Sequence, residues 1–177
     1  MELTPYIYKL LPRFADTGSF GLLEGTYELA YFEKGPRRFS LEDGIRYNLT
    51  MSNTSGAVLI MGTVAAIVKT DCDRCLEPAQ LEVTGEVEAY VVFDATRLEA
   101  PSDEDEYVIA KGPDGRIDLA PMLFSALILA LPPMVLCSED CAGICPSCGA
   151  YLNYEPCSCV DGQVDNDHPF AALKDLL

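Results

Sequence analysis

A chain of 177 residues with 49% hydrophobic residues can bury a core of its own, which excludes an intrinsically disordered protein. The formal net charge is −16, and residues 100–177 hold three Lys or Arg against thirteen Asp or Glu. Because proteins bind bare nucleic acid by neutralising phosphates with Lys and Arg, the second half is excluded as a broad RNA-binding face. Such acidity favours basic protein partners.

The chain up to residue 110 predicts β-strands, because apolar and polar residues alternate or β-branched residues dominate. The predicted strands are residues 26–34, 45–53, a long strand within 57–75, residues 79–93, and 107–110. The alternation puts Ile45, Tyr47, Leu49 and Met51 on one face of the second strand. In the fourth strand it puts Leu81, Val83, Gly85, Val87, Ala89 and Val91 on one face.

Turns and loops are predicted between these strands. Residues 1–22 predict a helical turn and then a loop through Gly18 and Gly21, and Gly62 is typical of a bulge. The predicted turns and loops are residues 35–38, the acidic segment 94–106, and residues 112–115. Cys72 and Cys75 fall at the tip of the hairpin between the third and fourth strands, where both thiols can point out together.

One main helix is predicted from Leu119 to about Leu131, with Asp118 as N-cap. Residues 119–136 carry no charge, but Pro132 and Pro133 end the helix too early for it to cross a bilayer. The start of the chain shows no basic leader or long apolar run, which predicts a cytoplasmic protein. A short amphipathic helix is expected after Pro169.

This order of elements predicts an α+β fold. We expect an antiparallel sheet or partly open β-barrel packed by one main helix, with a Cys-rich, zinc-binding C-terminal segment. Consecutive strands without helical crossovers argue against a parallel α/β fold.

The eight cysteines allow several kinds of chemistry. Disulfides are disfavoured because cysteine is a small fraction of the chain and four of the eight lie in CxxC pairs. Neither CxxC pair has the βαβ setting of a redox dithiol, so a thiol-based redox protein or sensor is the alternative function. The spacing also differs from the ferredoxin iron–sulfur run. Zinc fits best, because it takes four thiolates delivered as short pairs.

The spacing predicts two structural zinc sites with four cysteine ligands each. The first is Cys145, Cys148, Cys157 and Cys159, in a zinc-binding subregion at residues 137–160. The second is Cys72, Cys75, Cys137 and Cys141, which would clip the hairpin tip to the segment after the helix. Spacing alone leaves swapped pairings open, such as the 72/75 pair with the 145/148 pair.

No catalytic residue is predicted. GxSxG, HExxH and P-loop motifs are absent from the sequence, and its single histidine, His168, is expected to be an exposed loop residue and not a ligand. We therefore expect a binding or scaffold protein and not an enzyme. The sequence has one cluster of basic residues, Lys34, Arg37, Arg38 and Arg46. We expect it to be the solvated end of a hairpin.

Four motifs in order resemble a known family. They are CDRCLEP at 72–78, GRIDLAPMLFSALILALPPMVLC at 115–137, CAGICPSCGAYLN…CSC at 141–159 and DNDHPFAALKDL at 165–176. Together they resemble the bacterial YceD family, also described as the large ribosomal RNA subunit accumulation protein. The likeness runs from Cys72 to the C-terminus, with a looser match over the N-terminal strands.

The resemblance implies a single YceD-like domain over residues 1–177. It implies a non-enzymatic cytoplasmic factor that supports accumulation of 23S ribosomal RNA and assembly of the large ribosomal subunit. From the charge we expect a basic ribosomal protein or a large-subunit assembly intermediate as partner, with only limited RNA contact through the basic cluster, and no membrane.

Two departures from the family pattern bear on these expectations. Many members lack most of these cysteines, so zinc would be a stabilising device of one branch. The helix after IDL carries no charge here, where related helices tend to carry Glu. We therefore expect it to be covered by the sheet on one side and by the C-terminal segment or a partner on the other.

Overall fold

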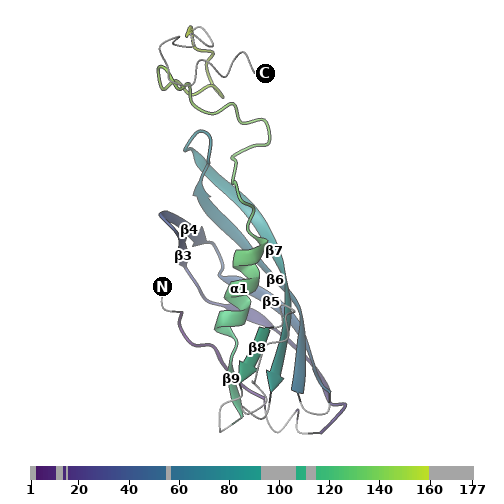
Figure 1. The fold of residues 1–177 in the computed structure, drawn as a ribbon. Helices are drawn as coiled ribbons and strands as arrows, with labels where there is room; N and C mark the ends of the chain where they lie inside the picture. The colour runs from purple at the N-terminus through teal and green to yellow at the C-terminus, as the bar shows by residue number, and fades with distance from the viewer. Residues whose placement is uncertain are drawn as a thin grey trace, which may run out of the picture.

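The sheet is built around one long antiparallel hairpin, formed by β6 (Ala57–Asp71) and β7 (Pro78–Val92), which pair along their whole length. The computed structural model describes residues 3–10, 14, 16–54, 57–92, 107–110 and 115–159, and only the backbone of 107–110. Figure 1 shows the sheet curving around one helix, α1 (Ala120–Ala130), which lies against one of its faces.

Strand β6 is the centre of the sheet, since one edge pairs with β7 and the other with two different strands. Over residues 58–65 that edge pairs with β5 (Ile45–Asn53), and nearer the hairpin tip it pairs with β4 (Arg37–Leu41). Strand β2 (Phe20–Tyr27) adds to β5, and β3 (Tyr31–Lys34) adds to β4. At this edge of β6 the sheet therefore divides into two branches, one formed by β5 and β2 and the other by β4 and β3.

Three short strands complete the described fold. Strand β8 (Tyr107–Ala110) pairs with β7 in the one parallel arrangement of the described sheets. Strands β1 (Ile7–Lys9) and β9 (Arg116–Asp118) form a separate two-stranded antiparallel sheet. The predicted fold class, a mostly antiparallel sheet packed by one helix, is confirmed.

The predicted strand at residues 26–34 is interrupted, and the predicted loop is right at Gly18 but wrong at Gly21, which lies in β2. β2 ends at Tyr27 and β3 begins at Tyr31, because the chain changes its partner from β5 to β4 between them. Glycines hide the alternation of β2. A Cβ on Gly25 would lie 2.5 Å from the hydroxyl of Tyr47, so the missing side chain makes room for that buried ring.

No bulge forms at Gly62, which pairs in register with Leu49 on one side and Val87 on the other. The predicted faces of β5 and β7 are confirmed: the inward residues of β5 are buried, and Glu82, Glu86 and Glu88 of β7 are exposed. These inward faces and α1 share one hydrophobic core.

The N-terminus of α1 differs slightly from the prediction. Leu119, and not Asp118, is the N-cap residue, and its side chain makes no capping bond. The Asp118 carboxylate nevertheless accepts hydrogen bonds from the backbone N–H of Ala120 at 3.0 Å and of Tyr6 at 2.8 Å. Asp118 thus satisfies one free N–H of the helix and ties it to the N-terminal segment. Among the described residues, no helix is long and apolar enough to span a membrane.

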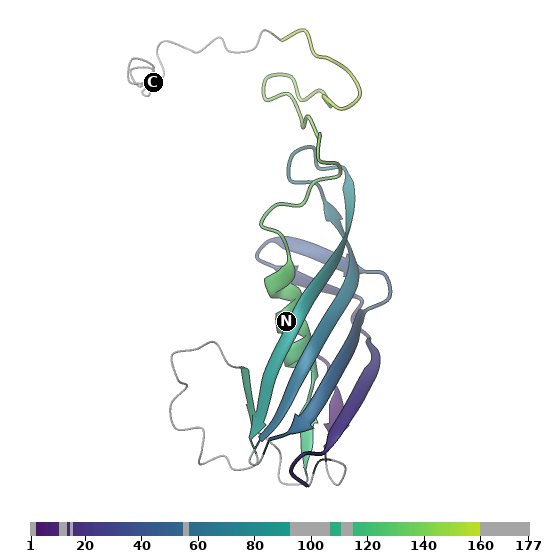
Figure 2. The same ribbon diagram turned by 90° about the vertical axis from the view of Figure 1, so that its right-hand side faces the viewer.

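The helix is covered on its second side by the β3–β4 hairpin and not by the cysteine-rich segment. The Phe124 ring meets Phe32 edge-on with centroids 5.5 Å apart, and Phe32 stacks on Phe39. Leu129 remains 86% exposed. Figures 1 and 2 show the cysteine-rich segment beyond the tip of the β6–β7 hairpin, away from the helix.

Candidate metal centres

The first cysteine cluster, here called site 1, joins the β6–β7 hairpin tip to the chain after α1. It consists of Cys72, Cys75, Cys137 and Cys141. Their four Sγ atoms all lie within 4.8 Å of one another, with Cys72 to Cys141 at 3.7 Å and Cys75 to Cys137 at 3.5 Å. Sulfurs bound to one tetrahedral zinc at about 2.3 Å lie about 3.8 Å apart, so the donor set fits zinc.

The two segments of site 1 are fastened by hydrogen bonds as well as by the cysteines. The backbone N–H of Asp73 donates to the carbonyl of Val135 at 2.8 Å, and the Val135 N–H donates to the Asp73 carboxylate at 2.6 Å. Arg37 of β4 binds both oxygens of that carboxylate, at 2.7 and 2.8 Å. The Val135 N–H and then the Arg37 guanidinium hold the pKa of Asp73 below its usual value.

The thiols at the hairpin tip are not exposed to solvent. Cys72 and Cys75 are both fully buried, since the segment after α1 folds over them. Burial raises the pKa of Cys72, but hydrogen bonds from backbone N–H groups, including that of Arg74, outweigh it and lower the pKa to about 6. Burial raises the pKa of Cys75 to about 12.

The lowered pKa of Cys72 and the raised pKa of Cys75 mean that the cluster loses one proton readily and the next one with difficulty. Thiolates packed this closely repel one another, and a divalent cation removes that penalty. All eight cysteines lie in the described part of the chain, and none is disulfide-bonded. Site 1 can therefore hold a metal ion.

The second cluster, here called site 2, is local in sequence. It consists of Cys145, Cys148, Cys157 and Cys159, whose Sγ atoms also lie within 4.8 Å of one another. A tight turn sets the first pair: the Gly149 N–H donates to the Cys145 carbonyl at 2.9 Å, and the Cys145 N–H donates to the Ala150 carbonyl at 2.9 Å. Gly149 has φ +76°, a conformation that glycine adopts without strain.

The electrostatics of site 2 repeat those of site 1. Backbone N–H groups of Cys148 and Ser147 lower the pKa of Cys145 to about 6. The neighbouring Cys148 and Cys145 thiols raise the pKa of Cys159 to about 12. Site 2 is more open to solvent, since Cys148 is exposed and Cys157 and Cys159 are half-buried. Site 2 can hold a metal ion too.

Asn153 links the two sites and was not predicted from the sequence. It lies in the loop between Cys148 and Cys157, yet its amide nitrogen is 3.4 Å from the Sγ of Cys141 and 4.0 Å from that of Cys137. Its carbonyl oxygen accepts the N–H of Ala142 at 2.6 Å. Asparagine in a loop has no distinctive spacing, so the sequence held no signal for this role.

The structure brings the eight cysteines together in the two predicted groups and not in the swapped pairing. His168 and the predicted C-terminal helix lie outside the described residues, as do the acidic segment 94–106 and most of the turn at 112–115.

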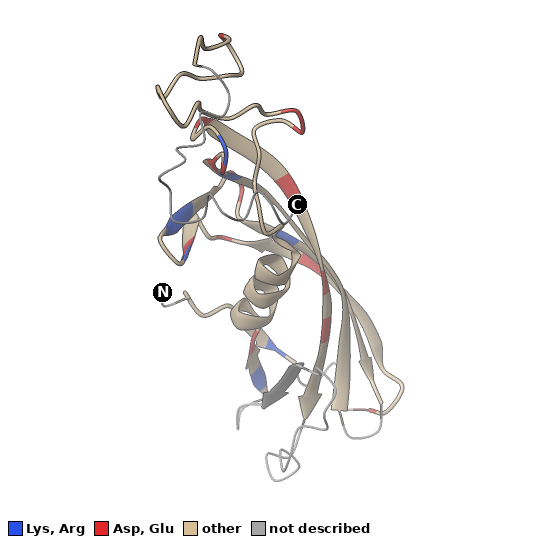
Figure 3. Cartoon of the chain, turned by 45° about the horizontal axis from the view of Figure 1, so that its top comes forward, with Lys and Arg blue, Asp and Glu red and all other residues tan. Residues whose placement is uncertain are grey.

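The four basic residues do not form one free surface. Arg37 is engaged by Asp73, the Arg38 guanidinium lies 3.8 Å from the centroid of the Tyr31 ring, and Arg46 pairs with Glu82 at 3.4 Å. Lys34 is exposed beside them on the β3–β4 hairpin, whereas Arg46 lies on β5. The end of the β3–β4 hairpin is one of several separate places on the described chain that carry Lys or Arg (Figure 3).

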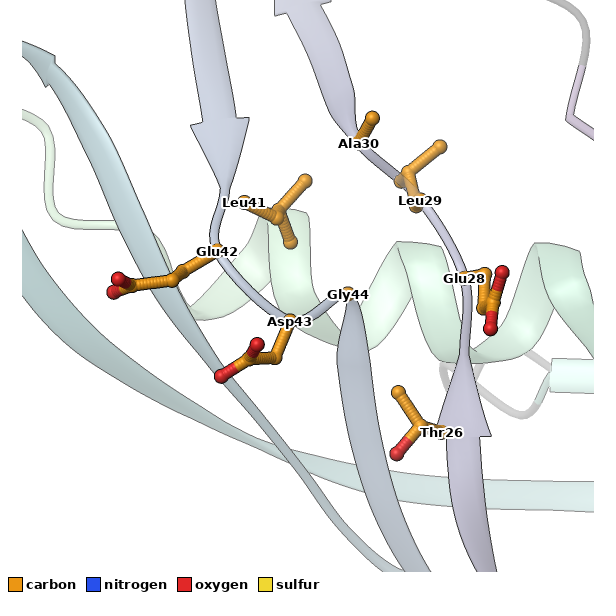
Figure 4. Close-up of a pocket in the computed structure, with 8 residues that line it drawn as sticks. All are labelled: Thr26, Glu28, Leu29, Ala30, Leu41, Glu42, Asp43 and Gly44. Atoms are coloured by element: carbon orange, nitrogen blue, oxygen red, sulfur yellow. The ribbon is translucent and has the colours of Figure 1, made fainter.

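A pocket of about 540 Å³ opens between the β2–β3 connection and the β4–β5 turn (Figure 4). Its lining residues are Thr26, Glu28, Leu29, Ala30, Leu41, Glu42, Asp43 and Gly44. It offers carboxylates around an apolar floor, with Glu42 paired to Lys69 at 3.2 Å. The lining residues contain no Cys, His or Lys.

Comparison with known proteins gives one family and several relatives. A family model described as "Large ribosomal RNA subunit accumulation protein YceD" matches residues 60–177. Uncharacterized protein Rv2926c of Mycobacterium tuberculosis is 34% identical over 109 residues, which are 62% of this chain and 52% of that protein. Uncharacterized protein ML1660 of Mycobacterium leprae is 34% identical over 115 residues, 63% of this chain and 51% of that protein. The chain thus spans about half the length of these curated relatives. No solved structure matches it.

Proposed function

This chain belongs to the YceD family, and we propose that it supports accumulation of 23S ribosomal RNA and assembly of the large ribosomal subunit. The extent of the match carries this proposal. Residues 60–177 include most of β6, all of β7 and α1, and all eight cysteines. We also propose that the protein acts in the cytoplasm as a binding factor and not as an enzyme.

We assign zinc to both sites as a structural ion. Zinc takes four thiolates in a closed tetrahedron and has no redox chemistry of its own. At site 1 the four cysteines would hold the hairpin tip against the chain after α1. At site 2 they would close the loop that contains Asn153. A four-thiolate set leaves no open position for substrate, which supports a structural role over a catalytic one.

The alternative, a thiol-based redox protein, is less well supported. A dithiol catalyst needs two cysteines, one of them accessible and of low pKa. Here each cluster has four, and Cys72, one of the two thiols with a pKa lowered to about 6, is fully buried. Two complete four-sulfur sets argue for metal binding.

The outer face of the sheet, turned away from α1, suggests how the protein meets a partner. Glu86 and Glu88 lie there on β7, and among the described residues neither pairs with a Lys or Arg. Register places Met61 of β6 beside Glu88, and Leu22 of β2 lies two strands further along the same row. Met61 is 45% exposed and Leu22 56% exposed.

A basic segment with an apolar side chain among its Lys and Arg residues fits this face. Its cations would meet the unpaired carboxylates, and its apolar side chain would cover Met61 and Leu22. Figure 3 shows acidic positions along the long β6–β7 hairpin. We therefore propose a basic ribosomal protein, presented by a large-subunit assembly intermediate, as the direct partner. Contact with RNA would be limited to Lys34 and its neighbours.

Depletion of the protein tests the cellular function. We expect sucrose gradients of depleted cells to show fewer large-subunit particles and less 23S ribosomal RNA, with restoration by the wild-type chain. A normal level of both in depleted cells would contradict the assembly role.

A charge reversal on the outer face tests the partner. Glu88→Lys should abolish recovery of basic ribosomal proteins in a pull-down and fail to restore the gradient. Glu28→Lys in the β2–β3 connection makes the same change in net charge at an exposed position away from this face and should behave as wild type. Recovery of naked RNA without any ribosomal protein would overturn the partner assignment.

A further inference from the structure

Asn153 belongs to the loop that site 2 closes, yet its side chain contacts the sulfurs of site 1. The amide nitrogen lies 3.4 Å from the Sγ of Cys141 and 4.0 Å from the Sγ of Cys137. These two cysteines supply half of site 1. A residue held by one site therefore completes the surroundings of the other.

The orientation of the Asn153 amide is fixed by chemistry. Its oxygen accepts the backbone N–H of Ala142 at 2.6 Å, which requires an acceptor there. Its NH₂ group then faces the two sulfurs, which as metal-bound thiolates accept hydrogen bonds. Such a donor disperses the negative charge of the ligand and holds it in place, so it strengthens the site.

The position of Asn153 depends on the loop and not on the hydrophobic core. Asn153 itself is exposed. The loop is shaped by the bridge between Ile144 and Tyr151, by the Leu152 N–H bond to the Gly143 carbonyl at 3.0 Å, and by the closure of site 2. Opening site 2 frees the far end of this loop at Cys157, so Asn153 loses one of these three supports.

We propose that Asn153 is a positioning residue that couples the two metal sites, so that metal at site 2 strengthens metal binding at site 1. This rests on the metal binding proposed above. Coupling between binding equilibria is reciprocal, so metal at site 1 strengthens site 2 by the same factor. The two sites then load and release metal together.

Site-resolved thiol protection tests the coupling. The full chain is loaded with zinc and treated with a chelator and N-ethylmaleimide, and alkylation of each cysteine is followed by peptide mass spectrometry. Asn153→Ala should accelerate alkylation of Cys72, Cys75, Cys137 and Cys141 about tenfold. Asn153→Asp keeps the acceptor for Ala142 but removes the donor, and should accelerate it at least as much. Tyr154→Phe, an exposed and uncharged change at the residue next to Asn153, should leave it unchanged.

A double-mutant cycle separates coupling from general loosening. Cys148→Ser opens site 2 and should also accelerate alkylation of the site 1 thiols. Adding Asn153→Ala to Cys148→Ser should bring no further acceleration, because both changes break the same link between the two sites. Unchanged protection of site 1 in Asn153→Ala, full protection in Asn153→Asp, or multiplied effects in the double variant would overturn the coupling while leaving the zinc assignment intact. A wild-type chain without bound zinc, alkylated at once at all eight cysteines, would overturn both.

Discussion

Site 1 and site 2 have the same four-sulfur chemistry but opposite relations to the fold. Site 1 joins cysteines 62 and 69 residues apart and lies at the end of the longest hairpin, with Cys72 and Cys75 fully buried. Site 2 takes all its ligands from one short segment, and Cys148 is exposed. One site therefore fastens distant parts of the chain, and the other shapes a loop.

This difference predicts different energetic roles. A cross-link that closes a long loop removes more disorder from the unfolded chain than one that closes a short loop. By the relation used for disulfides, a loop the length of site 1 is worth about 4 kcal/mol and one the length of site 2 about 3 kcal/mol. Only site 1 stabilises the sheet directly, because only site 1 includes residues of the β6–β7 hairpin.

Loss of a site 1 ligand should have the largest effect. Cys75→Ser should lower the free energy of unfolding of the sheet by about 4 kcal/mol, since the long cross-link is lost. Urea unfolding followed by far-UV circular dichroism measures this, because the chain has no Trp to report by fluorescence. An unchanged unfolding midpoint in zinc-loaded protein would contradict the fastening role.

Loss of the Asp73 clamp, the carboxylate that binds both Arg37 and the Val135 N–H, should have the second-largest effect on stability. Asp73→Ala removes the bonds to Arg37 and to the Val135 N–H, and should cost about 2 kcal/mol at neutral pH. The pKa of Asp73 is lowered on folding, so its contribution is present above the unfolded pKa of 3.8 and is lost as pH falls through the folded pKa. In acid titrations of stability, the wild type and Asp73→Ala should therefore converge below pH 3.8. A constant difference between them would contradict the clamp.

Opening site 2 should affect the sheet less than opening site 1. Cys148→Ser should lower the stability of the sheet only through weaker metal binding at site 1, and a tenfold loss of affinity corresponds to about 1.4 kcal/mol. Unfolding of both serine variants at one fixed free zinc concentration makes the comparison. Equal losses in Cys148→Ser and Cys75→Ser would remove the distinction between the sites.

Alanine substitutions at two glycines should show the smallest difference in stability. Gly143 and Gly149 have φ of +80° and +76°, so alanine is strained at both by about 1 kcal/mol. A Cβ on Gly143 would also lie 3.2 Å from the Arg74 carbonyl in site 1, whereas nothing lies within 4 Å at Gly149. Gly143→Ala should therefore lower the unfolding midpoint more than Gly149→Ala. The reverse order would contradict the packing of Gly143 against the hairpin tip.

Regular side-chain alternation made much of this fold predictable. The inward faces of β5 and β7 and the hairpin tip at Cys72 follow from period-two patterns. The short cysteine pairs follow from spacing, but which pairs share a site comes from the structure. Strand β2 was missed because Gly21 and Gly25 interrupt its alternation, and Gly25 is needed by the ring of Tyr47. β1, β4 and β9 are too short to show a period.

Contacts between distant segments could not be predicted in the same way. Asn153 reaches Cys141 and Arg37 reaches Asp73 only because the fold brings their loops together. Neither pair has a characteristic spacing. The full burial of Cys72 and Cys75 could not be predicted, because their cover comes from residues 135–141, whose path depends on the end of α1.

Zinc K-edge X-ray absorption of the purified chain tests the central claim most directly. Two closed four-thiolate sites predict about two zinc ions per chain, each with four sulfurs near 2.3 Å and no nitrogen or oxygen in the first coordination shell. A first shell containing nitrogen or oxygen, an iron–sulfur spectrum, or a chain without metal would contradict the account.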